Sequence, residues 1–432
     1  MSLFYVDLLN YDHDKINTKT YKNQENIEYV IISSKIETND EGLLKDNEFP
    51  EYRSLIKTQD NNLLCVSPPS SIDFDSFSTF FSKQENKDIM INEIVEGTMI
   101  NLFYDERIQS WEITTRTYVG CNNWFTSMEY DEYGEKSQQQ KTFRQMFYDA
   151  IGSTDLNHFF QLYNTNYCYS FVLQHPYNHM VLPIEVPRLY LVAVYEIINS
   201  SKYIDYQSYT VYVRSISLFS ETDQHSCIDF INEHFELYHN IFIPLLIKPS
   251  NKNLVDFGKE YNSFETDSFE MPDYFVRSFF EHVSNYYTMG LMLTHMKTGK
   301  RTCISNKIYE YIKQIRGNNP NLQYQFFELK KSTKIDEFLY YFSIYKPLFD
   351  IFEKKYQDFI TNVHQTYYSY YVLKSGQQMP KQYFIHAAKI HHEIFLPEKR
   401  IIRRNVVVEY FLKFTPSELM YYMVNFQKEK TA

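Results

Sequence analysis

This sequence of 432 residues has few glycines and few cysteines. It also has no excess of positive charge and no long hydrophobic run. With only 10 glycines, flexible Gly-rich linkers are not expected. The 43 Lys and Arg against 54 Asp and Glu give a net charge of −11, so any nucleic-acid contact must come from a local patch. The five cysteines are odd in number and scattered, which predicts reduced thiols in a cytoplasmic compartment and no disulfide-linked partner.

Export and membrane signals are also missing. The first 15 residues, MSLFYVDLLNYDHDK, have acidic residues where a signal peptide needs basic and then apolar ones. No stretch approaches the roughly 18 apolar residues of a membrane span, and the closest, IFIPLLI at 241–247, is short enough to be core. We therefore expect no membrane partner.

Aromatic residues are abundant instead. The 40 Tyr and 35 Phe, in a chain that is 44% hydrophobic, can bury a large core and exclude a disordered chain. Up to about residue 310, short apolar runs are typical of strands, and two stretches have helical patterning. The strand-like runs lie at 62–66, 89–97, 98–105, 111–120, 167–181, 188–197 and 288–306, and the helix-like ones at 137–150 and 275–287.

The period of the apolar residues becomes helical from about residue 306, with a break at Gly376 to Pro380. The sequence therefore predicts an α+β fold. A mixed, largely antiparallel sheet domain spans residues 1–310, and an all-helical domain spans residues 311–432. Residues 1–50 form a divergent N-terminal part of the first domain, with strands at the edge of a sheet.

Several short motifs stand in a fixed order between residues 50 and 316. They are Arg53, the turn Ile94-Val95-Glu96-Gly97, the pair Thr115-Arg116, the run FVLQHPYN at 171–178, Met289-Gly290, and finally Cys303 and Ser305, six and four residues before Tyr309. In order and spacing they resemble the motifs of phage-type ATP-dependent RNA ligases, which are covalent nucleotidyltransferases. The chain looks closest to the divergent ligase-like proteins of giant DNA viruses. The resemblance implies a nucleotidyltransferase-like fold for the sheet domain.

In the family that the motifs resemble, a lysine attacks ATP, becomes adenylated and passes AMP to an RNA 5′-phosphate. The resemblance places that lysine at Ile94, glutamates at Val172 and Met289, and paired lysines at Cys303 and Ser305. Isoleucine cannot attack phosphorus, and neutral side chains offer no ligand to a hard cation. Without the paired lysines, the developing charge of the transition state is not stabilised.

We therefore expect no catalytic residue, no metal ligand and no cofactor. ATP and Mg²⁺ would be needed only if a non-standard nucleophile kept the chain active. The resemblance implies a vestigial nucleotide pocket made of Arg53, Ile94, Glu96, Gly97, Arg116, Val172, Met289, Gly290, Cys303 and Ser305.

Three of the retained positions have two interpretations each. The Glu96-Gly97 turn is either a hairpin feature needed for folding or a ligand contact. Arg116 either lines the vestigial pocket or forms an ion pair with Glu96. Arg53 is either a surface residue or a phosphate ligand.

Basic residues gather at two places, and the resemblance to RNA ligases makes them candidates for RNA binding. The simpler interpretation is a solvated charged face. The candidates are Lys300, Arg301, Lys313 and Arg316 near the join of the domains, and Lys399, Arg400, Arg403 and Arg404 in the helical domain.

Three hypotheses about function follow. The first is a pseudoenzyme, a catalytically degenerate RNA-ligase-like protein that binds RNA or RNA ends or acts as a scaffold. The second is an active nucleotidyltransferase with a non-standard nucleophile. The third is a structural or virion-associated protein that binds other proteins. Each is expected in the cytoplasm, which for a viral protein means the host cytoplasm or viral factory, or in the virion.

Overall fold

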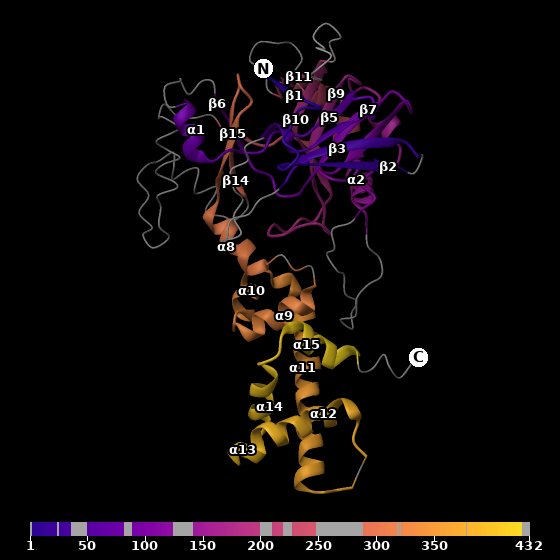
Figure 1. Ribbon diagram of the computed structural model, residues 1–432. Helices are drawn as coiled ribbons and strands as arrows, with labels where there is room; N and C mark the ends of the chain where they lie inside the picture. The colour runs from indigo at the N-terminus through magenta and orange to yellow at the C-terminus, as the bar shows by residue number, and fades with distance from the viewer. Residues whose placement is uncertain are drawn as a thin grey trace. The chain divides into compact units, whose positions relative to one another are not determined.

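The computed structural model describes residues 2–23, 26–35, 50–81, 89–123, 141–198, 210–218, 227–247, 288–317, 319, 321–376 and 378–425. The described residues up to Lys313 form one compact unit, and those from Gln314 form a second. All of the described strands belong to the first unit, and the second is helical (Figure 1). The predicted α+β class, with antiparallel sheets followed by helices, is confirmed.

The largest sheet is antiparallel along the order β1-β11-β10-β9-β7-β8, and β12 pairs with β10 in parallel. Residues of β9 alternate between the two faces of this sheet, so that Tyr169, Phe171 and Leu173 enter one apolar cluster and Cys168 enters another. In order along the sheet, the strands are β1 (Leu3–Asp7), β11 (Thr210–Ile216), β10 (Arg188–Ile198), β9 (Tyr167–Gln174), β7 (Thr98–Asp105) and β8 (Ser110–Thr114), with β12 (Ile241–Phe242) beside β10.

Each face of the large sheet is covered by a different layer. A four-stranded sheet in the order β2-β3-β4-β5 buries one face, and short helices bury the other. The covering strands are β2 (Ile16–Lys22), β3 (Glu28–Ser34), β4 (Leu55–Lys57) and β5 (Leu63–Val66). The strands expected within residues 1–50 are thus β1, at an edge of the large sheet, and β2 and β3; residues 36–49 lie outside the described part.

The helices of the first unit are short. In α2, Thr142 caps the N-terminus in a capping box with Gln145, and Gly152 ends the helix in the left-handed conformation. The helix expected at 137–150 therefore begins only at Phe143, whereas residues 137–140 and the helix expected at 275–287 lie outside the described residues. The helices are η1 (Pro50–Tyr52), α1 (Phe74–Phe81), α2 (Phe143–Ile151), α3 (Leu156–Phe159), α4 (Cys227–Glu233), α5 (Phe235–Tyr238) and α8 (Lys307–Arg316).

The third sheet has the order β13-β6-β14-β15, and its ladders are antiparallel. The strands are β13 (Leu246–Ile247), β6 (Ile89–Glu93), β14 (Gly290–His295) and β15 (Arg301–Ser305), which confirms the strand pair expected at 288–306. Helix α1 packs through Phe74 and Phe77 against Ile91, Leu293 and Ile304. The opposite residues of β15, including Cys303 and Ser305, stay exposed.

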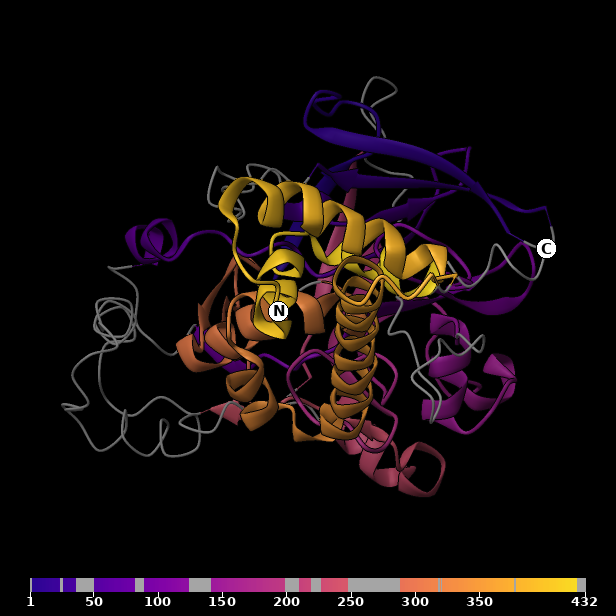
Figure 2. The same ribbon diagram turned by 90° about the horizontal axis from the view of Figure 1, so that it is seen from below.

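The second unit is built around the long helix α11 (Lys346–Tyr367), whose buried residues recur every three or four positions. Helices α12 and α14 pack against α11 (Figures 1 and 2). The break expected at Gly376 to Pro380 is confirmed, because the next helix begins at Lys381. The other elements are α9 (Leu322–Lys331), α10 (Ile335–Tyr341), η3 (Ser343–Tyr345), η4 (Tyr368–Val372), α12 (Lys381–Ile390), η5 (His391–Phe395), α13 (Leu396–Glu398), α14 (Arg404–Phe411), α15 (Pro416–Met420) and η6 (Tyr421–Asn425).

Candidate functional site

The turn from Ile94 to Gly97 joins β6 to β7 and thereby links the third sheet to the large one. The backbone N–H of Ile94 donates to the carbonyl oxygen of Gly290 at 2.8 Å, which extends the pairing of β6 with β14 by one residue. Ile94 itself is only partly buried, and its side chain lines a cavity beside the turn.

Glu96 is buried, and its side chain is hydrogen-bonded by other segments of the chain. Its side chain is only 4% exposed. The carboxylate accepts hydrogen bonds from the backbone N–H groups of Met180 (2.5 Å), Val181 (3.1 Å) and Leu182 (3.0 Å), and from the hydroxyl of Tyr309 at 2.8 Å. Burial and the neighbouring Glu96 charge raise the pKa of Tyr309 far above its usual value, so this hydroxyl stays a donor. The geometry favours the interpretation of Glu96-Gly97 as a folding feature.

Glycine is required at two places beside this turn because other backbone segments approach closely. At Gly97, where φ is +150°, a Cβ atom would lie 2.4 Å from the carbonyl oxygen of Leu173 and 2.7 Å from Cγ1 of Val172. At Gly290, where φ is +146°, it would lie 2.1 Å from the carbonyl oxygen of Ile304. No side chain fits at these separations, so both motif glycines are explained by packing.

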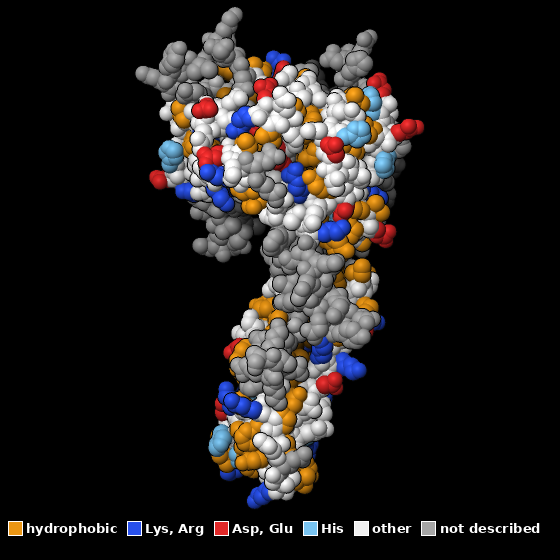
Figure 3. All heavy atoms as spheres, turned by 90° about the vertical axis from the view of Figure 1, so that its right-hand side faces the viewer, with side chains coloured by type: hydrophobic (Ala, Val, Ile, Leu, Met, Phe, Trp, Pro, Cys, Tyr) orange, Lys and Arg blue, Asp and Glu red, His pale blue; other side chains and the backbone are white. Residues whose placement is uncertain are grey.

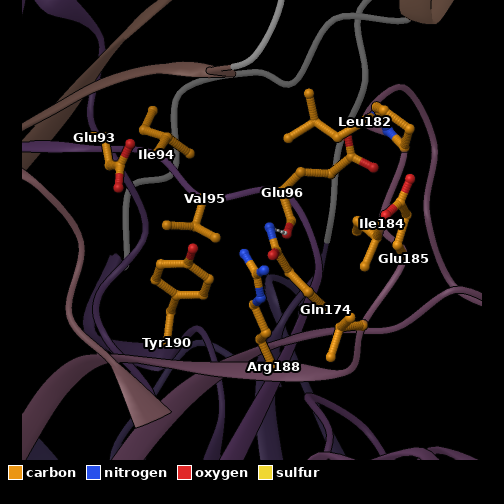
Figure 4. Close-up of a pocket in the computed structure, with 12 residues that line it drawn as sticks. Glu93, Ile94, Val95, Glu96, Gln174, Leu182, Ile184, Glu185, Arg188 and Tyr190 are labelled. Atoms are coloured by element: carbon orange, nitrogen blue, oxygen red, sulfur yellow. Dashed lines mark hydrogen bonds between the residues drawn. The ribbon is translucent and has the colours of Figure 1, made fainter. Parts of the chain in front are cut away.

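A cavity of about 280 Å³ opens between the Ile94–Glu96 segment and the ends of β9 and β10. The amide of Gln174 donates to the backbone oxygen of Glu96 at 3.0 Å and closes one side (Figure 4). Glu93 comes from the end of β6, and the other lining residues come from the loop between β9 and β10 and from β10 itself. The full lining is Glu93, Ile94, Val95, Glu96, Gln174, Leu182, Pro183, Ile184, Glu185, Val186, Arg188 and Tyr190.

The cavity keeps charged groups that lie outside the sequence motifs. Arg188 points into it between Tyr190 and Gln174 (Figure 4), with its guanidinium 5.5 Å from the centre of the Phe242 ring. Burial, followed by the charge of Glu93, raises the pKa of Tyr190, while Arg188 lowers it. Sequence reasoning missed these residues, although strand alternation predicts that Tyr190 lies on the same face as its cross-strand partner Val172.

The remaining motif positions do not meet in this cavity. Val172 is buried in β9 between Met99 and Tyr190 of the neighbouring strands and packs beneath Gly97. Met289 precedes β14, and its carbonyl oxygen accepts from the N–H of Asn306 at 2.8 Å. The residues that line the cavity do not include Met289, Cys303 or Ser305.

Arg116 does not form an ion pair with Glu96, so that interpretation is wrong. Its guanidinium donates instead to the carbonyl oxygen of Ser34 at 2.7 Å, and Glu96 already has its four donors. Arg53 is half-buried. Burial, followed by the charges of Arg301 and Arg116, lowers the pKa of Arg53 to about 10.

The other candidate RNA-binding residues differ in their surroundings. Lys313 pairs with Glu310 at 3.3 Å, and Arg400 pairs with Glu409 at 2.8 Å. Arg316 is buried beside the ring of Tyr345, which makes it a poor RNA ligand. Lys300, Lys399, Arg403 and Arg404 are partly or fully exposed, with Arg404 also donating to Gln357. Figure 3 shows basic and acidic side chains interspersed over one face of the molecule.

Three further structural findings bear on the expected ligands and partners. Within the described ranges there is no group of three or more His, Cys, Asp and Glu side chains that could hold a metal ion. Cys65, Cys121, Cys168 and Cys303 carry free thiols. None of the helices in the described part of the chain has the length and apolar character needed to cross a bilayer.

Comparison with known proteins gives a sequence match and distant structural matches. No protein-family model matches the chain. A segment of 102 residues is 28% identical to an RNA ligase of Rhodothermus phage RM378, which covers 24% of this chain and 22% of the phage protein. The chain thus matches only about a fifth of the length of that curated relative.

Two solved structures of ligases resemble the chain at low TM-scores. An archaeal ATP-dependent RNA ligase is 8% identical with a TM-score of 0.37, covering 72% of this chain and 62% of its own. A putative ATP-dependent DNA ligase from Aquifex aeolicus is 10% identical with a TM-score of 0.36, covering 96% of this chain and 76% of its own.

Proposed function

We propose that this chain is an RNA-ligase-like protein that has lost nucleotidyl transfer and binds RNA, in particular RNA ends. One observation carries the proposal. Ile94, at the position where the resemblance places the lysine nucleophile, lines a cavity whose described residues include a single cation, Arg188. A guanidinium stays protonated near neutral pH, so Arg188 cannot replace a lysine amine as the nucleophile.

The surroundings of Glu96 support the loss of chemistry. Its two carboxylate oxygens are occupied by three backbone N–H groups and the Tyr309 hydroxyl. A carboxylate held in this way has little capacity left to coordinate a divalent cation. The cavity does offer Glu93 and Glu185, yet the paired lysines that would neutralise a triphosphate are replaced by Cys303 and Ser305. Among the described lining residues, a bound Mg-triphosphate would therefore have only Arg188 as a cationic partner.

The test for lost chemistry is an adduct assay on the full chain. Incubation with α-labelled ATP or GTP, with Mg²⁺ or Mn²⁺, is expected to leave no label on the denatured protein. A covalent adduct that survives alkali but not acid is a phosphoramidate, and it would establish the active-enzyme alternative instead. A known RNA ligase treated in parallel shows that the assay detects such an adduct.

RNA binding by this protein is expected to be electrostatic and local. The proposal draws on the sequence similarity to the phage RNA ligase and on the exposed Arg403 and Arg404. Neutralising both, as Arg403→Gln with Arg404→Gln, should reduce the slope of log K against log salt by about 1.4 for single-stranded RNA. Arg214→Gln is the matched control, because that exposed arginine already pairs with Glu196 at 3.0 Å. An unchanged slope in the double variant would exclude these arginines from the interface.

A second candidate function, a structural or virion-associated protein, is favoured by exposed apolar side chains of the helical unit. Tyr340 is 81% and Ile344 is 75% exposed. A protein that shows no salt-dependent RNA binding, and that self-associates or captures a partner through these residues, would support this alternative. A cytoplasmic or viral-factory location, and the resemblance to giant-virus proteins, stay predictions.

A further inference from the structure

Two π-helical turns of the second unit meet at one end of the long helix α11. The first, η4, continues α11, and the second, η5, joins α12 to α13 (Figure 1). Between them the rings of Tyr371 and His391 are stacked, with their centroids 3.9 Å apart and their planes at 11°. Turns of π-helix are rare and occur frequently at functional sites, so the surface that these two turns present is a candidate for binding.

Three rings form a column across the two turns. The ring of His391 also stacks on that of Phe395, with centroids 5.0 Å apart and planes at 19°. Buried Tyr367 packs against Tyr371 at 5.2 Å, and its hydroxyl lies 3.4 Å from Nδ1 of His391. Burial, followed by neighbouring positive charges, lowers the pKa of His391, so the middle ring is neutral near pH 7. The ring column of Tyr371, His391 and Phe395 is therefore fixed in place by the core.

The aromatic surface at this end of the unit is open to solvent. Tyr370 is 47% exposed, and its ring meets that of Tyr371 edge-on at 4.9 Å. The three rings of the column are themselves only half-buried. Contiguous exposed apolar surface marks a binding site, whereas single scattered side chains do not.

A basic segment adjoins the ring column. Residues 389–404 carry five Lys and Arg against two Glu, whereas the whole chain has a net charge of −11. The ammonium of Lys399 lies 5.9 Å from the centre of the last ring in the column. Within the described part of the chain, the ion pair of this segment joins Arg400 to Glu409 at 2.8 Å, which leaves exposed Lys399 and Arg403 without a carboxylate. Aromatic rings and positive charge thus occur together on this surface.

We propose that the ring column, together with Tyr370, binds unpaired bases of single-stranded RNA. The choice of RNA rests on the proposed function, whereas the description of the surface does not. Every base has a π-face that stacks on an aromatic ring, and Lys399 and Arg403 would meet the phosphates between the bases. An apolar protein partner would bury both cations without a counter-charge, which is unfavourable. Paired bases have no free face, so duplex RNA should not bind in this way.

The first experiment separates the bases from the phosphates. Binding of the full chain to a labelled short oligouridylate is compared with binding to an abasic strand of the same length. The two strands carry the same charge, so wild type should bind the oligouridylate about ten-fold more tightly through stacking. The slope of log K against log salt should be the same for both strands, because stacking releases no counterions.

The second experiment removes the rings one at a time. Phe395→Leu and Tyr370→Ser should each reduce the preference for the oligouridylate several-fold and leave abasic binding unchanged, whereas Phe395→Trp should keep the preference. Tyr340→Ser is the matched control, because that tyrosine is 81% exposed elsewhere in the same unit. Misfolding would weaken the binding of both strands alike, so the ratio of the two affinities measures stacking. Lys399→Gln should instead reduce the salt slope of both strands by about 0.7.

Each outcome decides between the proposals. Equal affinity of wild type for the two strands, or a preference that Phe395→Leu and Tyr370→Ser leave intact, overturns base stacking while electrostatic RNA binding stands. Failure to bind either strand overturns both proposals. Self-association that Tyr370→Ser abolishes, in a protein that binds neither strand, would identify the surface as a protein interface instead.

Discussion

Replacing Glu96 by glutamine should destabilise the first unit, although the substitution keeps the size of the side chain. The carboxylate accepts from Met180, Val181, Leu182 and Tyr309, whereas an amide has one oxygen and one NH₂ group. At least one backbone N–H would then face another donor. Losing charge-assisted bonds and leaving a buried donor unsatisfied together cost about 3 kcal/mol of unfolding free energy.

The assay is urea unfolding followed by the fluorescence of Trp111, which is buried in the core of the same unit. Glu185→Gln is the matched control, because this exposed carboxylate of the same cavity should change stability by less than about 0.5 kcal/mol. Tyr309→Phe alone should cost about 1.5 kcal/mol, and the double variant should cost less than the sum. If Glu96→Gln is as stable as the control, the structural role assigned to Glu96 is refuted.

Three further predictions concern single positions. Gly97→Ala should destabilise the first unit by about 3 kcal/mol, since its Cβ would meet Leu173 at 2.4 Å, whereas Gly152→Ala, with open space around it, should cost about 1 kcal/mol in urea unfolding. Burial lowers the pKa of His386 to about 4, so the folded state resists protonation and stability is lost as pH falls from 6.5 toward 4. The loss should reach about 3 kcal/mol, and it should disappear in His386→Asn when unfolding is measured across that pH range. Ile94→Lys alone should form no nucleotidyl adduct with labelled ATP, because the motif glutamates and paired lysines are still absent; a labelled band would show that a lysine suffices.

Much of the fold could be predicted from the sequence because its signals are local. The alternating residues of β9 and β10 and the helical period of α11 depend only on which face of each element is buried. The start of α2 was misplaced because the capping box of Thr142 and Gln145 was not recognised. The assignment of β2 and β3 to a separate sheet depends on long-range pairing with β4, which no local pattern reveals.

The candidate site was predicted less completely, for a physical reason. The motif positions Ile94, Glu96 and Gly97 lie in one turn, since they are close together in sequence. Arg188 enters the cavity from a strand about 90 residues further on, and only the pairing of β9 with β10 brings it there. The burial that lowers the pKa of Arg53 likewise arises from tertiary packing.

The hydrogen bond between Tyr309 and Glu96 joins residues that are 213 positions apart. A ribosome releases the residues around position 96 long before it has made Tyr309, so the turn lacks its last donor during most of synthesis. Contacts of such large sequence separation close late and slow the folding of a domain. The turn beside the cavity therefore gains its last hydrogen bond only after α8 has been translated. A chain that ends before that helix would lack the bond from Tyr309 to Glu96.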